Sequence, residues 1–337
     1  MKFARYIQLS LLASLVVVGG LATPVPARAQ NAPRGSIDRV VAFGASLTDA
    51  GNAFIWLSQP ANQNCGTPLN VPPYDALDDL LVPDGPYARG GHHFTNGATW
   101  VEGLARYLAL AGNARPALQS SGMKASNYAV GGARAVADYP CRFNLPAQIR
   151  AYLTDFPQTS ARTLVAIEIG GNDVRDALTA AASGQDPTPY IANALSSLTE
   201  SITQLYGRGV RKFLVLNVPD IGKTPAVRKL DQLFPGIAQY ADTLSRAYND
   251  GLALAVQRLV AAGVDVRILD VYASLNTIVA DPGKYGFLNA TDACITPNQP
   301  PFTCAQPDTY VFWDGIHPTK ALHAIVAQQA IAAISAP

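Results

Sequence analysis

The sequence predicts an α/β protein with a parallel β-sheet that helices cover on both faces. Five short runs of apolar and β-branched residues alternate with longer segments of helical periodicity, which is the pattern of strands joined by helical crossovers. The runs are largely apolar and continuous, as is typical of parallel strands that are buried on both faces. We expect the crossovers between these strands to be right-handed.

Small or turn-forming residues mark where the predicted strands end. The first run stops at Gly44, the second at Gly131 and the third at Gly170, and the fourth is followed by Pro219. Glycine at these points permits tight turns and a close approach of the backbone to a ligand. The predicted strands are 40–43, 126–130, 163–169, 213–217 and 266–270.

Five helices are predicted from apolar residues that recur at intervals of three and four positions. They lie between the strands and after the last one. A long segment, 59–97, is rich in Pro, Gly and Asn, and a loop of this length in a compact domain is usually functional or disordered. The predicted helices are 99–110, 145–153, 191–206, 237–261 and 319–334.

The composition is that of a folded protein that does not bind nucleic acid. The chain has 337 residues, of which 49% are hydrophobic and 15% charged, so it can bury a core. Its net charge of +1, without a long run of either sign, lacks the basic stripe typical of a nucleic-acid-binding protein.

The first 29 residues have the pattern of a signal peptide. Lys2 and Arg5 precede an apolar stretch over 7–21, and Ala27-Arg28-Ala29 is similar to a cleavage site. The alternative is a membrane anchor, but the stretch is shorter than the ~20 residues that a span usually needs. We therefore predict an exported protein, periplasmic or extracellular, whose residues 30–337 form a single domain with no stable membrane span.

Four cysteines are predicted to form disulfides because the chain is exported. No C-x-x-C pair exists and the chain has only four histidines, so no zinc site is expected. Four cysteines allow three pairings, and the sequence alone does not choose among them. We favour Cys294 with Cys304, which closes a short Pro-rich loop, and Cys65 with Cys141.

One aspartate–histidine pair has the spacing of a catalytic base and its orienting acid. Asp314 precedes His317 by three residues in a tight turn, so its carboxylate can hold one ring nitrogen while the other takes a proton. The alternative is that Asp314 only caps the turn. His323 lies within the last predicted helix, where a packing role is expected.

A nucleophile for this pair is predicted at the end of the first strand. Ser46 is followed by Leu47 and Thr48, so the G-x-S-x-G elbow of ordinary α/β-hydrolases is absent. Candidate donors for an oxyanion are the backbone N–H groups of Ser46 and Gly132 and the side-chain amide of Asn172. The alternatives are a helix-capping role for Ser46 and a turn-forming role for Asn172.

Five segments of the chain together resemble the GDSL esterase/lipase family, whose members are also called SGNH hydrolases. The resemblance runs from about residue 38 to the C-terminus, and the segments occur in the family's order. They are Phe43-Gly44-Ala45-Ser46-Leu47-Thr48-Asp49-Ala50-Gly51-Asn52, Phe94-Thr95-Asn96-Gly97-Ala98-Thr99-Trp100-Val101-Glu102, Asn127-Tyr128-Ala129-Val130-Gly131-Gly132-Ala133, Ile169-Gly170-Gly171-Asn172-Asp173 and Asp314-Gly315-Ile316-His317-Pro318.

This resemblance implies a three-layer αβα, flavodoxin-like fold with about five parallel strands. It also implies hydrolysis of a small-molecule or lipid ester through an acyl-enzyme, with no metal or cofactor. By position, Ser46 is the nucleophile, His317 the base and Asp314 its orienting acid. Gly132 and Asn172 complete the oxyanion hole, with Gly131 as the neighbouring alternative. The other functions we considered are a phospholipase, a lipid acyltransferase and a binding domain without catalytic activity.

The sequence departs from the family at Ala45, where an aspartate is usual. We expect the absent carboxylate to have braced the turn and not to have been a member of the triad. Glu168, in the third predicted strand, is a candidate to replace it. A carboxylate in a buried strand must be paired or protonated, and we favour a hydrogen bond from Glu168 to neighbouring backbone or side chain.

Overall fold

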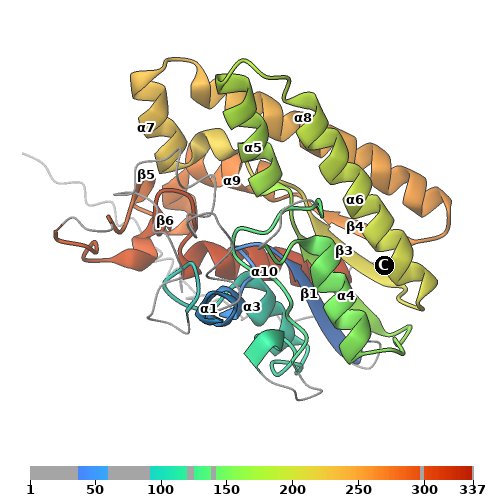
Figure 1. Ribbon diagram of the computed structural model, residues 1–337. Coiled ribbons are helices and arrows are strands. Elements are labelled where there is room, and N and C mark those ends of the chain that lie inside the picture. The colour runs from blue at the N-terminus through green and yellow to red at the C-terminus, as the bar shows by residue number, and fades with distance from the viewer. Residues whose placement is uncertain (1–36, 60–91, 120–124, 138–141, 297–299, 336–337) are drawn as a thin grey trace, which may run out of the picture. The chain divides into compact units, whose positions relative to one another are not determined.

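The computed structural model describes residues 37–59, 92–119, 125–137, 142–296 and 300–335, all of which belong to one compact unit. Its centre is a parallel sheet in which four strands follow each other in the order β1-β2-β3-β4 (Figure 1). Arg39 pairs with Thr163, Leu164 with Lys212 and Lys212 with Asp265. The strands are β1 (Arg39–Gly44), β2 (Thr163–Glu168), β3 (Lys212–Leu216) and β4 (Asp265–Leu269).

The predicted strand at 126–130 lies beside β1 but does not form a regular strand. Tyr128 N–H donates to the Ala42 carbonyl at 2.8 Å, and Ala42 N–H donates to the Ser126 carbonyl at 2.9 Å. Only one parallel bridge, Ala42 to Asn127, joins it to β1, and Ala129 N–H turns to the Asn127 side chain. This local bond competes with a strand ladder. With the segment counted as a second strand, the order 2-1-3-4-5 is flavodoxin-like.

One face of the sheet is covered by α4, α5, α6 and α8 (Figure 1). Their apolar side chains and the residues of this sheet face, such as Phe43, Ile167 and Val215, form one buried cluster. Burial of these side chains is the main favourable contribution to folding on this side. The helices are α4 (Leu145–Asp155), α5 (Gly171–Ala182), α6 (Thr188–Gly207) and α8 (Ile237–Ala261).

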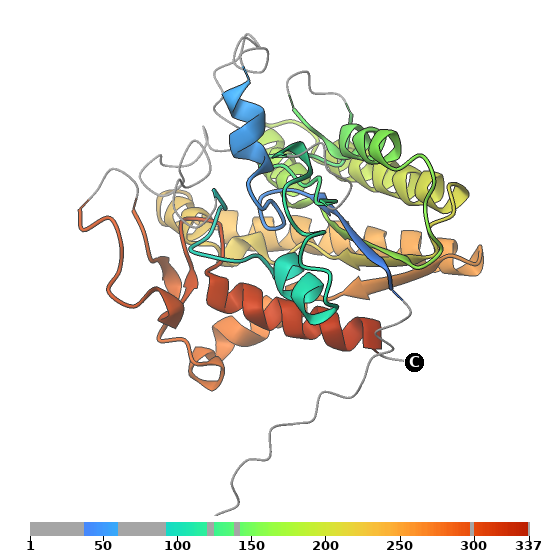
Figure 2. The same cartoon turned by 90° about the horizontal axis from the view of Figure 1, so that it is seen from below.

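The opposite face of the sheet packs against α3, α9 and α10. Figure 2 shows α3 and α10 side by side on this face. Trp100, Leu104 and Ala327 join sheet residues such as Leu164 and Leu214 in a second buried cluster. The predicted three layers are thus present. The helices are α3 (Trp100–Tyr107), α9 (Val271–Ala280) and α10 (Lys320–Ser335).

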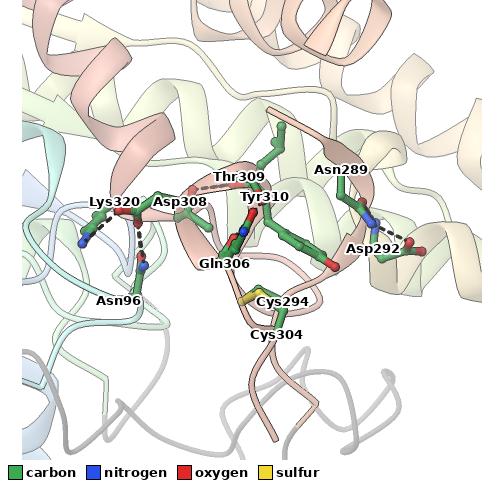
Figure 3. Close-up of a disulfide and its surroundings, with 12 residues drawn as sticks. Asn96, Asn289, Asp292, Cys294, Cys304, Gln306, Asp308, Thr309, Tyr310 and Lys320 are labelled. Carbon is green, nitrogen blue, oxygen red and sulfur yellow. Dashed lines mark hydrogen bonds and ion pairs between the residues drawn. A yellow bond between two sulfur atoms is a disulfide. The ribbon is translucent and has the colours of Figure 1, made fainter. Parts of the chain in front are cut away.

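A small two-stranded sheet precedes the C-terminal helix. Strands β5 (Asn289–Ala293) and β6 (Tyr310–Phe312) are parallel, and the Cys294–Cys304 disulfide joins the chain beside them (Figure 3). This bond agrees with the favoured pairing, while Cys65 and Cys141 lie outside the described residues. Short 3₁₀ helices cover Ala117–Gln119, Ile221–Lys223, Pro282–Tyr285 and Pro307–Thr309.

Four helices of the structure were not predicted from the sequence. Two of them, α1 and α5, begin close to the candidate site residues at the carboxyl ends of β1 and β2. A third, α7, contacts the turn before His317 through a hydrogen bond from Ala226 N–H to the Gly315 carbonyl at 2.8 Å. No helix among the described residues is long and apolar enough to cross a membrane. The additional helices are α1 (Asn52–Ser58), α5, α7 (Pro225–Leu233) and α9.

Candidate active site

Ser46 lies in a turn two residues beyond the end of β1, where the order of the strands reverses. In parallel α/β sheets, the crevice at this reversal is where ligands bind. The N–H groups of Thr48 and Asp49 both donate to the Ala45 carbonyl, at 3.1 and 3.0 Å, and close the turn. Ser46 is partly exposed, and its hydroxyl forms no hydrogen bond with the described residues. The turn therefore presents a serine side chain that is accessible to a ligand.

Only glycine fits immediately before this turn. Gly44 has a φ of +153°, and a Cβ at this position would lie 2.2 Å from the Glu168 carbonyl oxygen. The Gln148 side chain pairs with both backbone groups of Gly44, accepting from its N–H at 2.9 Å and donating to its carbonyl at 2.8 Å. The close approach of β1 and β2 is thereby kept at the point where the chain turns toward Ser46.

Glu168, the last residue of β2, stabilises the Ser46 turn by hydrogen bonds. Its Oε2 accepts from Ala45 N–H at 3.3 Å and from the Thr48 hydroxyl at 3.2 Å, and Thr48 in turn accepts from the Trp100 indole at 2.9 Å. The expectation that Glu168 bonds to neighbouring backbone and side chain is confirmed. Burial raises the pKa of Glu168 to about 8, although these two hydrogen bonds act in the opposite direction.

Ala45 is buried among the apolar residues on the α4–α8 side of the sheet. The carboxylate that the family usually has at this position is therefore absent from the core, and Glu168 braces the turn from the neighbouring strand. A second carboxylate at position 45 would stand beside Glu168 without water to solvate it. In this chain, Glu168 thus supplies to the turn the carboxylate that is absent at position 45.

Asp49 connects the Ser46 turn to the glycine pair after residue 130. Its carboxylate accepts from the N–H groups of Gly51, Asn52 and Ala53 at 2.6–2.9 Å and from Gly131 N–H at 2.8 Å. Burial raises the pKa of Asp49 to about 6, and the four N–H donors act in the opposite direction. The sequence showed Asp49 only as part of a motif. Three of its partners lie two to four residues away, whereas the contact with Gly131 spans 82 positions and could not be foreseen.

The two glycines differ in whether their N–H groups are available. Gly131 N–H is engaged by Asp49, and a Cβ on Gly131 would lie 2.2 Å from the Phe94 ring. Gly132 has a φ of +77°, and within the described residues its N–H donates to no protein acceptor. Within the described residues, the N–H of Ser46 also donates to no protein acceptor. Of the two alternatives, the geometry favours Gly132 as an oxyanion donor.

Asn172 is the second residue of α5 and not part of an isolated turn. Its side chain is buried, and Nδ2 donates to the Ala133 carbonyl at 2.9 Å. This bond ties the start of α5 to the residue after Gly132. A primary amide has two N–H donors, so one of them remains outside this bond.

Asp314 and His317 are joined in a buried pair. Asp314 Oδ2 lies 2.6 Å from His317 Nδ1, while Oδ1 accepts from the N–H groups of Ile316 and His317 at 2.8 and 2.7 Å. Asp314 thus caps the turn with one oxygen and contacts the His317 ring with the other, an arrangement compatible with both interpretations of the sequence. With the carboxylate as acceptor, the ring proton lies on Nδ1 and the lone pair on Nε2.

Apolar residues connect the turn that carries His317 with the turn that carries Ser46. Phe94 packs on the His317 ring with centroids 5.2 Å apart and also fills the space beside Gly131. Leu47, which follows Ser46, lines a cavity of about 70 Å³ together with Ile316 and Pro318, which flank His317. No hydrogen bond joins Ser46 to His317. In unliganded enzymes such catalytic hydrogen bonds are often long and shorten when substrate binds.

His93 and His323 both have structural environments. His93 Nε2 lies 2.9 Å from a Glu102 carboxylate oxygen that also caps α3 through Thr99. His323 is buried in α10, and burial lowers its pKa to about 3, so it is neutral at physiological pH. In the part of the chain that the structure describes, no three His, Cys, Asp or Glu side chains are grouped as metal ligands would be.

Comparison with known proteins identifies similar sequences over most of the chain. Residues 40–330 match the family model described as GDSL-like lipase/acylhydrolase. A thermolabile hemolysin of Vibrio parahaemolyticus is 25% identical over 87% of this chain, and an Arabidopsis thaliana GDSL esterase/lipase is 24% identical over 85%. The match covers 63% of the hemolysin, so the chain spans less than two thirds of its length, and 83% of the plant protein.

Among solved structures, a catalytic mutant of an acetylxylan esterase from Geobacillus stearothermophilus aligns with a TM-score of 0.45 and 16% identity. The alignment covers 88% of this chain and 94% of the esterase.

Proposed function

The chain belongs to the GDSL-like lipase/acylhydrolase family, and on this premise we propose that it is an exported serine esterase or lipase acting on carboxylic acyl esters. The observation that carries this proposal is the buried Asp314–His317 pair, with 2.6 Å between Oδ2 and Nδ1, beside a partly exposed serine turn. The Cys294–Cys304 disulfide is compatible with export, because such bonds persist in oxidising compartments.

In the proposed reaction, Ser46 is the nucleophile. His317 Nε2 takes the hydroxyl proton as the oxygen attacks the ester carbonyl carbon, and the positive charge that develops on the ring is stabilised by Asp314. His317 then returns the proton to the departing alcohol, and the acyl group remains on Ser46. Water then gives a proton to His317 as its oxygen attacks the acyl carbon. The bond to Ser46 Oγ breaks, His317 returns the proton to Oγ, and the acid is released. Because the base must be neutral, the rate should decline on acidification.

The negative charge on the tetrahedral oxygen would be stabilised by the N–H groups of Ser46 and Gly132 and by the Asn172 amide. The first two donors have no protein acceptor within the described residues, and Asp49 and Asn172 hold their segments together. Donors that are already in place need no rearrangement during the reaction, and removal of one donor typically reduces kcat by about 10²–10³.

Replacement of Ser46 by alanine tests this proposal. The Ser46→Ala protein should lose nearly all hydrolysis of p-nitrophenyl butyrate and should no longer be labelled by a fluorophosphonate, with little change in thermal unfolding. Ser196→Ala is the matched control because Ser196 is exposed on α6 and bonds only to Glu200 on the same helix. Full activity of Ser46→Ala would exclude this mechanism. A wild-type protein without activity or label would instead favour a binding domain.

A further inference from the structure

A large apolar groove lies between α5 and α7, with the beginning of α8 as its base. Its volume is about 820 Å³, within the range of ~300–1,000 Å³ typical of small-molecule sites. Leu178 of α5, Val227 and Leu230 of α7 and Ile237 of α8 line it. Both α5 and α7 pack on α8, and Figure 1 shows them side by side at the same end of the molecule.

None of the candidate site residues lines the groove, but both of its walls are connected to segments that carry them. Arg175, which lines the groove, is three residues beyond Asn172 on α5, a rise of about 4.5 Å along the helix. On the opposite wall, Val227 is next to Ala226, whose N–H donates to the Gly315 carbonyl between Asp314 and His317. The α5 wall therefore begins within one helical turn of Asn172, and the α7 wall is hydrogen-bonded to the turn that carries Asp314 and His317.

The lining changes from charged to apolar along the groove. Arg175, only 7% exposed, is its single charged residue and lies at the inner end. At the outer end, Leu233, Phe234 and Tyr240 are 67%, 60% and 41% exposed. Large apolar side chains gathered at one exposed place mark a surface that contacts an apolar ligand. A polar inner end and an apolar outer end match an ester group followed by a hydrocarbon chain.

We propose that the α5–α7 groove binds the acyl chain of a long-chain ester whose carbonyl carbon is held at Ser46. The proposal rests on the proposed esterase function and names its substrate class. From Asn172 to Ala182 the α5 wall extends about 15 Å, which accommodates a long extended chain. The cavity beside Leu47 and Ile316 holds only about 70 Å³, the space of two or three water molecules, and is too small for such a chain.

Chain-length selectivity of the purified full-length protein tests the groove. The ratio of kcat/KM for p-nitrophenyl dodecanoate to that for p-nitrophenyl butyrate is measured with both esters as monomers below their micelle concentration. Each methylene that the groove removes from water should favour the long ester by up to about fourfold. In the wild-type protein we therefore expect the ratio to be well above one.

A tryptophan placed in the groove should lower this ratio, and the chain offers a matched control. Thr179 lines the groove on α5 and Thr203 lies away from it on α6; both are exposed, and each hydroxyl donates to the carbonyl four residues earlier. Thr179→Trp should reduce the ratio at least about tenfold, the equivalent of two buried methylenes. Thr203→Trp should leave it unchanged. Ala182→Trp, one helical turn farther out, should affect only the longest esters.

A second variant removes any dependence on how well a tryptophan is tolerated. Leu233→Asp introduces a charge at an exposed position at the outer end and should also lower the ratio, mainly through KM for the long ester. An unchanged ratio in Thr179→Trp and Leu233→Asp, with hydrolysis of the butyrate ester retained, would overturn the groove assignment. Absence of butyrate hydrolysis in the wild-type protein would instead refute the esterase function itself.

Discussion

At the scale of single residues, Asp314 uses its two oxygens for two different tasks. Oδ1 accepts the backbone N–H groups of Ile316 and His317 and stabilises the turn, whereas Oδ2 orients the imidazole. An asparagine would keep one acceptor for the backbone but would place an N–H donor opposite Nδ1. The ring would then carry its proton on Nε2, the nitrogen that must accept the serine proton.

We therefore predict that Asp314→Asn lowers kcat by about 10³–10⁴-fold while the melting temperature changes little. Ester hydrolysis and thermal unfolding of the same preparation check this expectation. Asp308→Asn is a suitable control, because Asp308 is an exposed aspartate six residues earlier that pairs with Lys320 (Figure 3). A kcat within tenfold of the wild-type value would mean that Asp314 is a turn residue alone.

Residue-scale reading of the sequence identified side chains whose role depends on a short local pattern. The Asp314–His317 pair and the Cys294–Cys304 bond both join residues ten or fewer positions apart, and the structure brings both together. Asp49 and Gln148 were missed as site residues, because the contacts by which they join the site, with Gly131 and Gly44, span 82 and 104 positions. Such contacts exist only once the sheet has assembled, so no spacing in the chain predicts them.

At the scale of elements, the Cys294–Cys304 disulfide stabilises the chain that leads to the Asp314–His317 turn. Cys294 N–H donates to the Phe312 carbonyl at 3.0 Å and Ile295 N–H donates to the Trp313 carbonyl at 2.8 Å, immediately before Asp314. The disulfide closes a loop with a sequence separation of 10. It restricts the unfolded chain near the segment from which Asp314 and His317 project.

Removal of this bond in a Cys294→Ser/Cys304→Ser double variant should lower the free energy of unfolding by about 2–4 kcal/mol. Urea denaturation monitored by circular dichroism measures the change. Thr303→Ser, an exposed substitution in the same loop, should have a much smaller effect. If the double variant were as stable as the wild-type protein, the loop would be held by its backbone hydrogen bonds and not by the disulfide.

Two of the helices that the sequence analysis missed, α5 and α7, bury mostly small or polar residues. In α5, only Val174, Ala177, Ala180 and the polar residues of the first turn are buried, so the apolar periodicity is weak. In α7, Pro225, Ala226 and Val227 are buried in the first turn, while the outer residues Leu230 and Leu233 face the groove. These helices are stabilised by packing on α8, a tertiary contribution that local periodicity does not report.

At the scale of the whole molecule, three buried carboxyl groups make stability depend on pH. Burial raises the pKa of Asp49 to about 6, of Asp173 to about 7 and of Glu168 to about 8. Tyr248, which faces both Asp173 and Glu168, has its own pKa raised by burial and stays neutral. Above their ordinary pKa values, these carboxyls release protons in the unfolded chain that the folded protein retains. The free energy of unfolding should therefore fall as pH rises.

We predict that the melting temperature declines from about pH 5 to about pH 9 and that Glu168→Gln makes this decline less steep. For Glu168 the contribution is fully present below its ordinary pKa of 4.5 and is lost as pH rises through about 8. That difference corresponds to a stability loss on the order of a few kcal/mol. Glutamine keeps an oxygen for Ala45 N–H and Thr48, so activity at neutral pH should persist. An equally steep decline in the variant would show that Glu168 does not retain its proton in the folded protein.

Fold class and layer order were predictable because each buried strand is a continuous apolar run and the covering helices are long. About five strands were predicted, whereas the sheet of the described residues has four. The segment 126–130 is not a regular strand, because Ala129 N–H donates to the Asn127 side chain and not to β1. The position of Ser46 at the strand reversal followed from its place after the first run. The groove between α5 and α7 could not be predicted, because its walls are the helices that the periodicity did not reveal.

The hydrogen-bonded chain from Trp100 through Thr48 to Glu168 has a spectroscopic consequence. The Trp100 indole is buried, and its N–H donates to the hydroxyl that contacts the Glu168 carboxyl. Ionisation of Glu168 would change the electric field at the indole and so its emission wavelength. The fluorescence difference between the wild-type protein and a Trp100→Phe variant thus provides an optical measure of the protonation of Glu168 beside the Ser46 turn.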